Sequence, residues 1–149
     1  KNKTKRIMAA LDLNTVRKHI EQRLIAELQT TPPISIVFNN MPNKPTTDKT
    51  FVLSQLEFDT GEYITLGGTT SSNNLVRGNL VLNIFTKSGV GIGANLIVGT
   101  RLRNLFNRII DLEGIYFRPP SGPTVLQQSA PEGYFQSRMT VDFEVVEQL

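Results

Sequence analysis

The run of residues 75–110 constrains this chain most, because the spacing of its apolar residues changes twice. Residues 75–85 carry apolar side chains at alternate positions, and a period of two predicts a strand. The apolar residues that share one face of this strand are Val76, Leu80, Leu82 and Ile84. A glycine-spaced turn follows, and apolar residues then recur at helical spacing as far as Ile110. These are Leu102, Leu105, Phe106, Ile109 and Ile110. A strand, a turn and an amphipathic helix form either a phosphate site or a helix that folds back on its own sheet.

A first helix is predicted from about Asn14 to Gln29. Its apolar residues lie four apart and form one stripe, at Val16, Ile20, Leu24 and Leu28. Asn14 or Thr15 is expected to cap it by accepting from an exposed backbone N–H. Pro32 and Pro33 follow the helix and cannot continue it, because proline lacks the N–H group.

Further strands are predicted on both sides of this central run. They cover 34–38, 51–58, 115–117 and 134–145, with a short extended piece at 125–126 after a proline-rich turn at 119–123. The last strand alternates cleanly, with its polar residues, among them Asp142 and Glu144, on one face. Residues 60–74 are rich in Gly, Ser, Thr and Asn and are expected to form a long loop, with a short extended piece at 63–66. The sequence therefore predicts an α+β fold, with two amphipathic helices packed on one face of a mainly antiparallel or mixed sheet.

Composition limits the classes of protein that this chain can belong to. The length of 149 residues predicts one domain, with residues 1–12 as a basic leader. Sixteen basic against 13 acidic residues leave a net charge of only +3, too little to indicate a nucleic-acid-binding protein. There is no cysteine, which excludes disulfides and thiolate metal sites and fits a reducing compartment. No apolar run approaches the roughly 20 residues that a membrane span needs.

No residue pattern indicates catalysis, a metal site or a cofactor site. His19 is the only histidine, and it falls on a helix without an accompanying nucleophile. Asp111 with Glu113, and Glu57 with Asp59, are each close in sequence, whereas acid–base work on a glycoside needs carboxylates held across a cleft by separate elements. The protein is therefore not expected to be an enzyme.

The loop Lys87–Asn95 lies between strand and helix, where phosphate-binding loops occur. It lacks the Gly-Lys-Ser or Gly-Lys-Thr of a Walker loop, and the third glycine of a dinucleotide-binding loop would fall at Leu96. A turn that lets the helix fold back is the favoured interpretation, and a nucleotide-binding domain that uses Gly89–Gly93 stays open as an alternative. Arg101, Arg103 and Arg108 form either the polar face of that helix or a contact with a partner.

An ordered set of residues from Ile64 onward resembles the tail terminator (minor tail protein U-like) family of tailed bacteriophages. The set comprises Thr65–Gly68, Arg77 and Gly78, Leu80–Thr86, Gly89 and Gly91 before a helix, and the final strand from Tyr134 to Phe143. The helix near the N-terminus and the strand after Pro33 are similar too, so that the resemblance covers about residues 13–145. The extension Thr69–Asn74 and the basic leader depart from the pattern.

The resemblance implies a structural virion protein of the phage neck, assembled in the host cytoplasm. Such a protein forms a hexameric ring on the head-proximal end of the tail tube, ends tube polymerisation and joins the tail to the head–tail connector, while DNA passes through its lumen without sequence recognition. Contact with the tail tube protein is expected on two long loops, at Asn43, Lys44, Lys49, Gly67, Gly68, Ser71 and Asn73. The contact between subunits is expected at Arg77, Arg101 and Arg103. Another neck component, such as a head-closure or tail-completion protein, is the alternative.

Overall fold

The computed structural model describes residues 12–30, 33–38, 50–63, 73–89, 91–107, 114–126 and 133–148. Two helices and six strands follow one another in an order that agrees with the prediction, and the α+β fold class is confirmed. Their bounds are α1 Leu13–Leu28, β1 Ser35–Phe38, β2 Phe51–Tyr63, β3 Asn73–Lys87, α2 Gly93–Phe106, β4 Ile115–Phe117, β5 Ser121–Leu126 and β6 Tyr134–Gln148.

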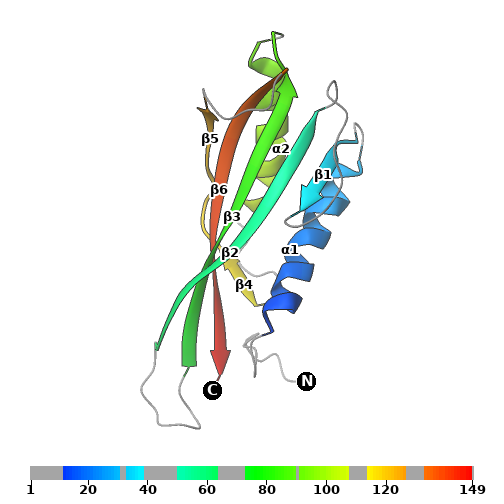
Figure 1. Ribbon diagram of the computed structural model, residues 1–149. Coiled ribbons are helices and arrows are strands. Elements are labelled where there is room, and N and C mark those ends of the chain that lie inside the picture. The colour runs from blue at the N-terminus through cyan, green and yellow to red at the C-terminus, as the bar shows by residue number, and fades with distance from the viewer. Residues whose placement is uncertain are drawn as a thin grey trace.

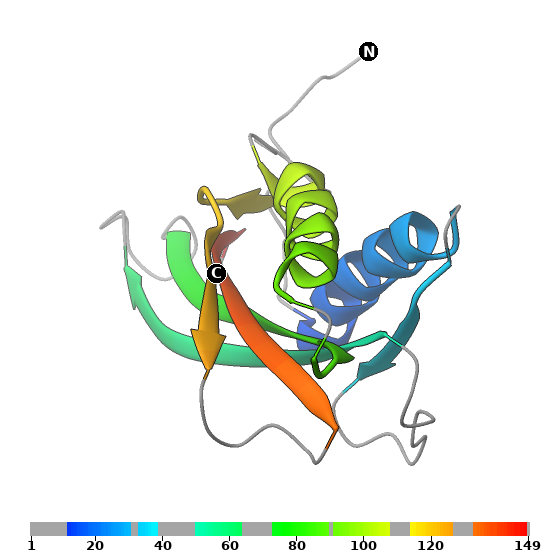
Figure 2. The ribbon, with the colours of Figure 1, turned by 90° about the horizontal axis from the view of Figure 1, so that it is seen from above.

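The six strands form one mixed sheet (Figure 1). The order is β1-β2-β3-β6-β4, and β5 pairs with β6 beside β4. Only β1 and β2 are parallel, and every other pair is antiparallel. Both helices lie on the same side of the sheet, and none of the described residues forms a helix on the other side (Figure 2).

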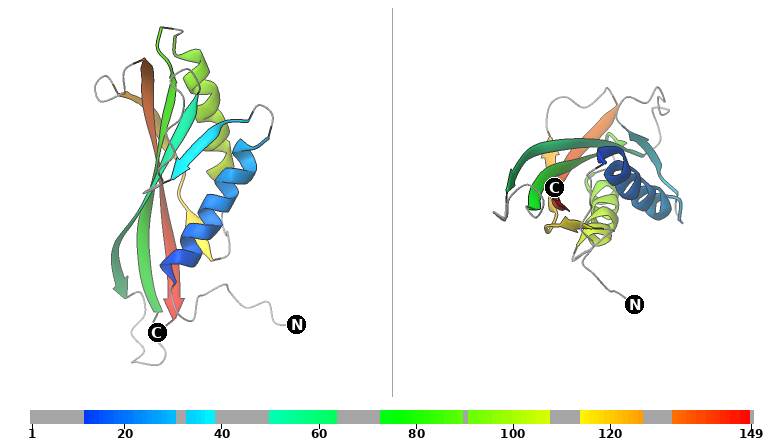
Figure 3. Two further views of the ribbon diagram at one scale, coloured as in Figure 1. Left: turned by 45° about the vertical axis from the view of Figure 1, so that its right-hand side comes forward. Right: turned by 90° about the horizontal axis from the view of Figure 1, so that it is seen from below.

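The central strands are longer than the sequence predicted. β2 runs past Phe58 to Tyr63, β3 begins at Asn73, and Tyr63 pairs with Asn74. The expected loop over residues 60–74 is therefore wrong at both ends, because pairing between neighbouring strands stabilises polar residues that have little strand propensity of their own. Residues 64–72 lie outside the described part of the chain. Figure 3 shows that this end of β2, β3 and β6 reaches past the start of α1.

Helix α1 begins one residue before the predicted position and has a different cap. The Asp12 carboxylate accepts hydrogen bonds from the backbone N–H of Asn14 and from the hydroxyl of Thr15, each at 3.0 Å. The expectation that Asn14 or Thr15 caps the helix is wrong, since an Asp side chain reaches the same exposed N–H groups. The predicted apolar stripe is confirmed, because its four residues are the buried residues of α1.

Helix α2 ends earlier than its apolar spacing suggested. The backbone of Asn107 is extended, with φ −74° and ψ 129°, so the helix stops at Phe106 instead of continuing to Ile110. Residues 108–113, with Arg108, Asp111 and Glu113, lie outside the described part. Strand β5, by contrast, is longer than the two residues predicted. It includes Pro123, whose ring packs beside Gly99 of α2.

One hydrophobic core fills the space between the helices and the sheet. It joins the α1 stripe and residues of α2, β3 and β6. These are Leu102 and Phe106 of α2, Leu80, Leu82 and Ile84 of β3, and Met139, Val141, Phe143 and Val145 of β6. On the other side of the sheet a smaller aromatic cluster forms at one end, where Phe51 stacks on Phe85 with ring centroids 4.5 Å apart. The alternation of β6 had predicted that this side of the sheet is polar throughout. The aromatic cluster shows that one end of it is apolar. Neither described helix is long and apolar enough to cross a membrane.

A buried asparagine fastens the start of α2 to the sheet. Asn95 is fully buried, and its side-chain N–H₂ donates to the backbone oxygen of Ile84 at 3.2 Å and to the hydroxyl of Thr86 at 3.4 Å. Its side-chain oxygen accepts from the hydroxyl of Ser137 on β6. Both ends of one amide are thus bonded to the two central strands, which fixes the position of the helix on them.

Replacing Asn95 should reveal this attachment. Asn95→Ala removes the partner of buried polar groups on both strands and should lower the free energy of unfolding by about 1–3 kcal/mol. Asn104→Ala changes an exposed asparagine of the same helix and should alter it by less than about 0.5 kcal/mol. Urea unfolding followed by circular dichroism measures both, and equal effects would show that Asn95 contributes no more than a surface residue.

Candidate functional site

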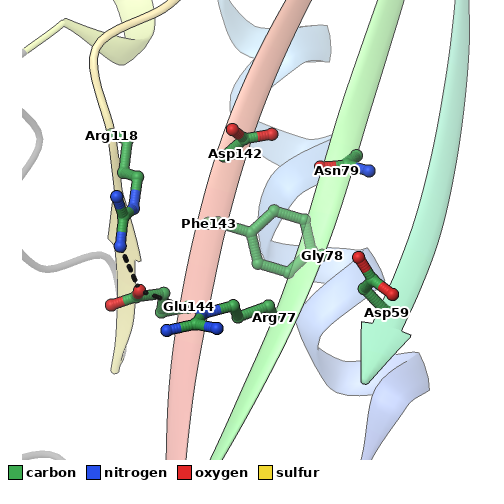
Figure 4. Close-up of a pocket in the computed structure, with 8 residues that line it drawn as sticks. All are labelled: Asp59, Arg77, Gly78, Asn79, Arg118, Asp142, Phe143 and Glu144. Carbon is green, nitrogen blue, oxygen red and sulfur yellow. Dashed lines mark hydrogen bonds and ion pairs between the residues drawn. The ribbon is translucent and has the colours of Figure 1, made fainter. Parts of the chain in front are cut away.

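The helix-free side of the sheet contains an open cavity of about 400 Å³. Figure 4 shows it from the side opposite α1, which lies behind the strands. The lining residues come from β2, β3, β6 and the segment after β4, and most are charged or polar. They are Asp59, Arg77, Gly78, Asn79, Arg118, Asp142, Phe143 and Glu144.

The pairing of β3 with β6 sets the floor of the cavity. Arg77 lies directly opposite Glu144, and Asn79 lies opposite Asp142. Because side chains alternate along a strand, these four side chains share one face, away from the helices. Arg118 joins them from the side, since its backbone N–H donates to the backbone oxygen of Asp142 at 2.9 Å.

A β-bulge in β2 supplies the opposite wall. Phe58 pairs with Gly78 and Gly61 pairs with Val76, so two residues of β2 face Arg77 alone. A bulge of this kind bends its strand and redirects a side chain. Asp59 is one of the two bulged residues and lines the cavity.

Two arginines converge on one carboxylate oxygen in the cavity. The Arg118 Nη2 atom donates to Glu144 Oε2 at 2.7 Å, and Arg77 Nε lies 3.5 Å from the same oxygen. The hydrogen bond from Arg118 lowers the pKa of Glu144, with Arg77 adding to the shift and partial burial opposing it. In return Glu144 raises the pKa of Arg118. The pair is open to water, since the Arg118 side chain is 60% exposed.

Beside them, Asp142 has an amide partner and also lies within electrostatic reach of Arg118, whose pKa it helps to raise. With its amide nitrogen turned toward Asp142, Asn79 donates to Asp142 Oδ1 at 2.5 Å and to the backbone oxygen of Gly78 at 3.2 Å. Glu144 is therefore shared by two cations, whereas the side chain of Asp142 is bonded to an amide.

Gly78 allows the sheet to pack closely behind the cavity. A Cβ atom built there would lie 2.3 Å from Cζ of Phe143 and 2.7 Å from the backbone oxygen of Glu57. The Phe143 ring lies beside Gly78 in Figure 4. Only a residue without a side chain fits between this ring and β2, which explains a glycine within a long strand.

The arrangement suits binding better than bond-making. The cavity holds three carboxylates and two guanidinium groups, no histidine and no cysteine. His19 lies on α1, on the other side of the sheet. Within the described residues, no three His, Cys, Asp or Glu side chains are placed to hold a metal ion. A shallow surface with paired charges recognises a complementary charged partner.

The three arginines predicted to contact a neighbouring subunit lie in two different places. Arg77 lines the cavity. Arg101 joins the helices, with its guanidinium 3.2 Å from the Glu27 carboxylate and 2.7 Å from the Glu27 backbone oxygen. Arg103 donates to the backbone oxygen of Pro120 at 3.0 Å. In return, Arg23 of α1 donates to the backbone oxygen of Leu105 at 3.0 Å, so Arg101 and Arg23 clamp the two helices together.

The residues predicted to contact the tail tube protein are mostly outside the described chain. Asn73 is the first residue of β3 and pairs with Gln148, instead of lying in a loop. The other six, Asn43, Lys44, Lys49, Gly67, Gly68 and Ser71, fall in segments that the structure does not describe.

Sequence reasoning found one face of the cavity but not the cavity itself. The alternation of residues 134–145 places Asp142 and Glu144 together on a polar face. It carries no signal that Arg118 or Asn79 meets them, because strand register and the bulge are not readable from one strand alone.

The glycine turn before α2 has an apolar surround. Gly89 and Gly91 both have φ of +87°, a conformation that favours glycine. Ile92, Leu96 and Ile97 are exposed by 44%, 42% and 65%. These three side chains offer no hydrogen-bond donor to a phosphate, and the turn lacks the Gly-Lys-Ser or Gly-Lys-Thr of a Walker loop.

Comparison with known proteins shows the fold alone. No family model matches the chain, and no curated protein does. Chains of solved structures do match, and one superposes with a TM-score of 0.67 over 91% of this chain and 96% of its own, at 17% sequence identity. Nothing in the name of that protein states a function.

A methyl group at Gly78 should be costly. Gly78→Ala forces the Phe143 ring and the backbone of β2 apart and should lower the free energy of unfolding by about 1–3 kcal/mol. The control is Gly93→Ala, where a Cβ atom meets nothing within 4 Å and a helix gains up to about 1 kcal/mol. Urea unfolding of both variants separates the two, and a neutral Gly78→Ala would contradict the close packing.

The ion pairs of Glu144 should make stability depend on pH. Because its pKa is lower when folded, Glu144 adds stability above its ordinary pKa, and this contribution is lost as the pH falls through the folded value. Urea unfolding should show wild type more stable than Glu144→Gln at pH 7, with the difference shrinking toward about pH 2. Glu57→Gln, on the same face, controls for the loss of one negative charge. A difference that stays constant with pH would refute the assignment.

Proposed function

We propose that the protein is a structural component of a tailed bacteriophage, a tail terminator. It forms a ring at the head-proximal end of the tail tube, ends tube polymerisation and joins the tail to the head–tail connector. The resemblance of residues 13–145 to the tail terminator family motivates the proposal. The observation that carries it is the sheet face without a helix layer, which holds an open cavity of charged side chains.

The two sides of the protomer differ, as a ring of identical copies requires. The sheet ends in β1 on one side, with α1 above it, and in β4 and β5 on the other side, with α2 nearby (Figures 1 and 2). A ring repeats one heterologous contact, in which two different surfaces of the same chain meet, until it closes. Different surfaces at the two sides of one sheet support head-to-tail contact.

The chemistry of the described surface supports a binding role instead of an enzymatic one. The carboxylate with the clearest electrostatic perturbation, Glu144, is held by two arginines in an open cavity. A general acid or base needs a pKa near the working pH, whereas that of Glu144 is shifted away from neutrality. The proposed partners are copies of the chain itself, the tail tube protein and the head–tail connector. DNA would pass through the lumen without sequence recognition.

Tube assembly tests the proposal directly. Tail tube subunits of the same phage, polymerised with the protein present, should give shorter tubes with a ring at one end in negative-stain electron microscopy. Native mass spectrometry should show about six copies in each ring. Tubes that grow to the same length with bare ends would refute the terminator. A ring found on the head connector instead of the tube would assign the protein to head closure, and saturable binding of ATP or NAD in calorimetry would favour the nucleotide-binding alternative.

A further inference from the structure

We propose that an apolar ridge beside the start of α2 inserts into an uncharged groove at the β1 edge of an adjacent copy of this chain. The ridge consists of Ile92, Leu96 and Val125, with Leu96 at its centre. The inference rests on the proposed ring and names the contact that repeats around it.

The first half of α2 presents large apolar side chains to solvent. Five large apolar side chains are exposed among the described residues, and three of them, Ile92, Leu96 and Ile97, lie at the start of this helix. Residues 92–100 contain no charged residue. A helix surface with several large exposed apolar side chains and no charge is typical of a contact between proteins.

Strand β5 adds a fourth exposed apolar side chain to this surface. Val125 is 38% exposed and pairs with Ser137, whose hydroxyl donates to Asn95 of α2. Strand β5 therefore runs beside the turn of α2 that contains Leu96.

The ridge lies on the side of α2 that faces β5. Gly99 of α2 packs beside Pro123 of β5. Leu96 is three residues before Gly99, and Ile92 is four residues before Leu96. Residues three and four apart share one face of a helix, so Leu96 and Ile92 both lie toward the β5 edge of the protomer.

A groove of about 590 Å³ lies at the opposite edge of the sheet. It is formed by the end of α1, the start of β1 and the residue before β2. None of its lining residues is charged, and they are Leu28, Gln29, Pro33, Ile34, Ser35 and Thr50. An apolar side chain can enter such a groove without leaving a charge buried and unpaired.

The ridge and the groove lie at the same end of the sheet. The side chain of Asn95 donates to the hydroxyl of Thr86, near the end of β3. Phe51, which follows Thr50 of the groove, pairs with Phe85 of the same strand. Both surfaces therefore lie where β2 begins and β3 ends, and Figure 1 shows the start of α2 and β1 in the upper half of the protomer.

The ridge of one copy can fill only the groove of another copy. Strands β2, β3 and β6 lie between β1 and β5, so the two edges are roughly 19 Å apart at about 4.8 Å per strand (Figure 2). An apolar surface that fits a groove elsewhere on the same chain makes a heterologous contact. Because the two surfaces lie at opposite edges and at one level, the repeated contact can close into a ring.

A disulfide between copies tests this contact, because the chain contains no cysteine of its own. Rings of two double variants, Leu96→Cys with Ser35→Cys and Leu96→Cys with Thr50→Cys, are oxidised and run on non-reducing gels. At least one should give a ladder of cross-linked multimers, since sulfurs bond only when their Cα atoms lie within about 7 Å. Leu13→Cys with Ser35→Cys is the control and should give monomers, because Leu13 begins α1 and the groove lies at its other end.

A loss of apolar surface should weaken the same contact. Leu96→Gln keeps the helix propensity and should weaken self-association at least about tenfold, because an apolar side chain is no longer buried between copies. Leu13→Gln is the matched control, since Leu13 is 46% exposed and Leu96 is 42% exposed, and it should leave assembly unchanged. Analytical ultracentrifugation and the fraction of tube ends that carry rings measure both variants, and thermal unfolding checks that they are folded.

The remaining outcomes each decide against the contact. Rings without either cross-link, or equal effects of Leu96→Gln and Leu13→Gln, would overturn it and leave the proposed ring in place. Cross-linked dimers of Leu96→Cys alone would show that two ridges meet each other. Normal rings of Leu96→Gln that no longer bind tubes would assign the ridge to the tube protein. The absence of rings in the unaltered protein overturns the proposed function as well.

Discussion

The antiparallel pairing of β3 with β6 is the constraint on which the other features of the structure depend. The register is continuous from Asn73 opposite Gln148 to Lys87 opposite Tyr134. It aligns two alternating strands so that their apolar residues face one side and their polar residues the other. A shift of one residue would bury Asp142 and Glu144 and expose Val141 and Phe143, which the hydrophobic effect strongly opposes. The same register thus creates both the core under the helices and the charged cavity on the other face.

The helices are held on this sheet by polar contacts as well as by apolar packing. The amide of Asn95 bonds to β3 and β6 inside the core, where an unmade bond would be costly. Arg23 and Arg101 reach across between the helices in opposite directions, each to a backbone oxygen near the end of the other helix. Hydrophobic contacts are not directional, so bonds of this kind select one placement of α1 and α2 among several that would bury a similar area. A fixed helix layer keeps its charged outer side in a constant position relative to the cavity.

The bare side of the sheet combines features that suit contact between proteins. Gly78 lets the Phe143 ring close the back of the cavity, and the bulge at Asp59 brings an acidic residue to its rim. Its charges are exposed and partly paired, which favours specificity and orientation in an assembly more than tight binding by themselves. A ring of identical subunits gains from this arrangement, because one modest contact is repeated at every interface. The proposed role in a phage tail uses this surface.

Local patterns in the sequence determined the type and order of the helices and strands. The stripe of Val16, Ile20, Leu24 and Leu28 and the alternation of residues 134–145 each reflect burial of one face, and such periodicity is a property of a short segment. Only the tertiary structure decided the extension of β2 and β3 through residues of poor strand propensity, the end of α2 at Phe106, and the burial of Asn95. It also decided that Arg118 forms an ion pair with Glu144 and that Arg101 of α2 bonds to Glu27 of α1. The reason is that these outcomes depend on bonds between residues far apart in the chain, and a segment read by itself contains no information about the register at which its distant partner will pair.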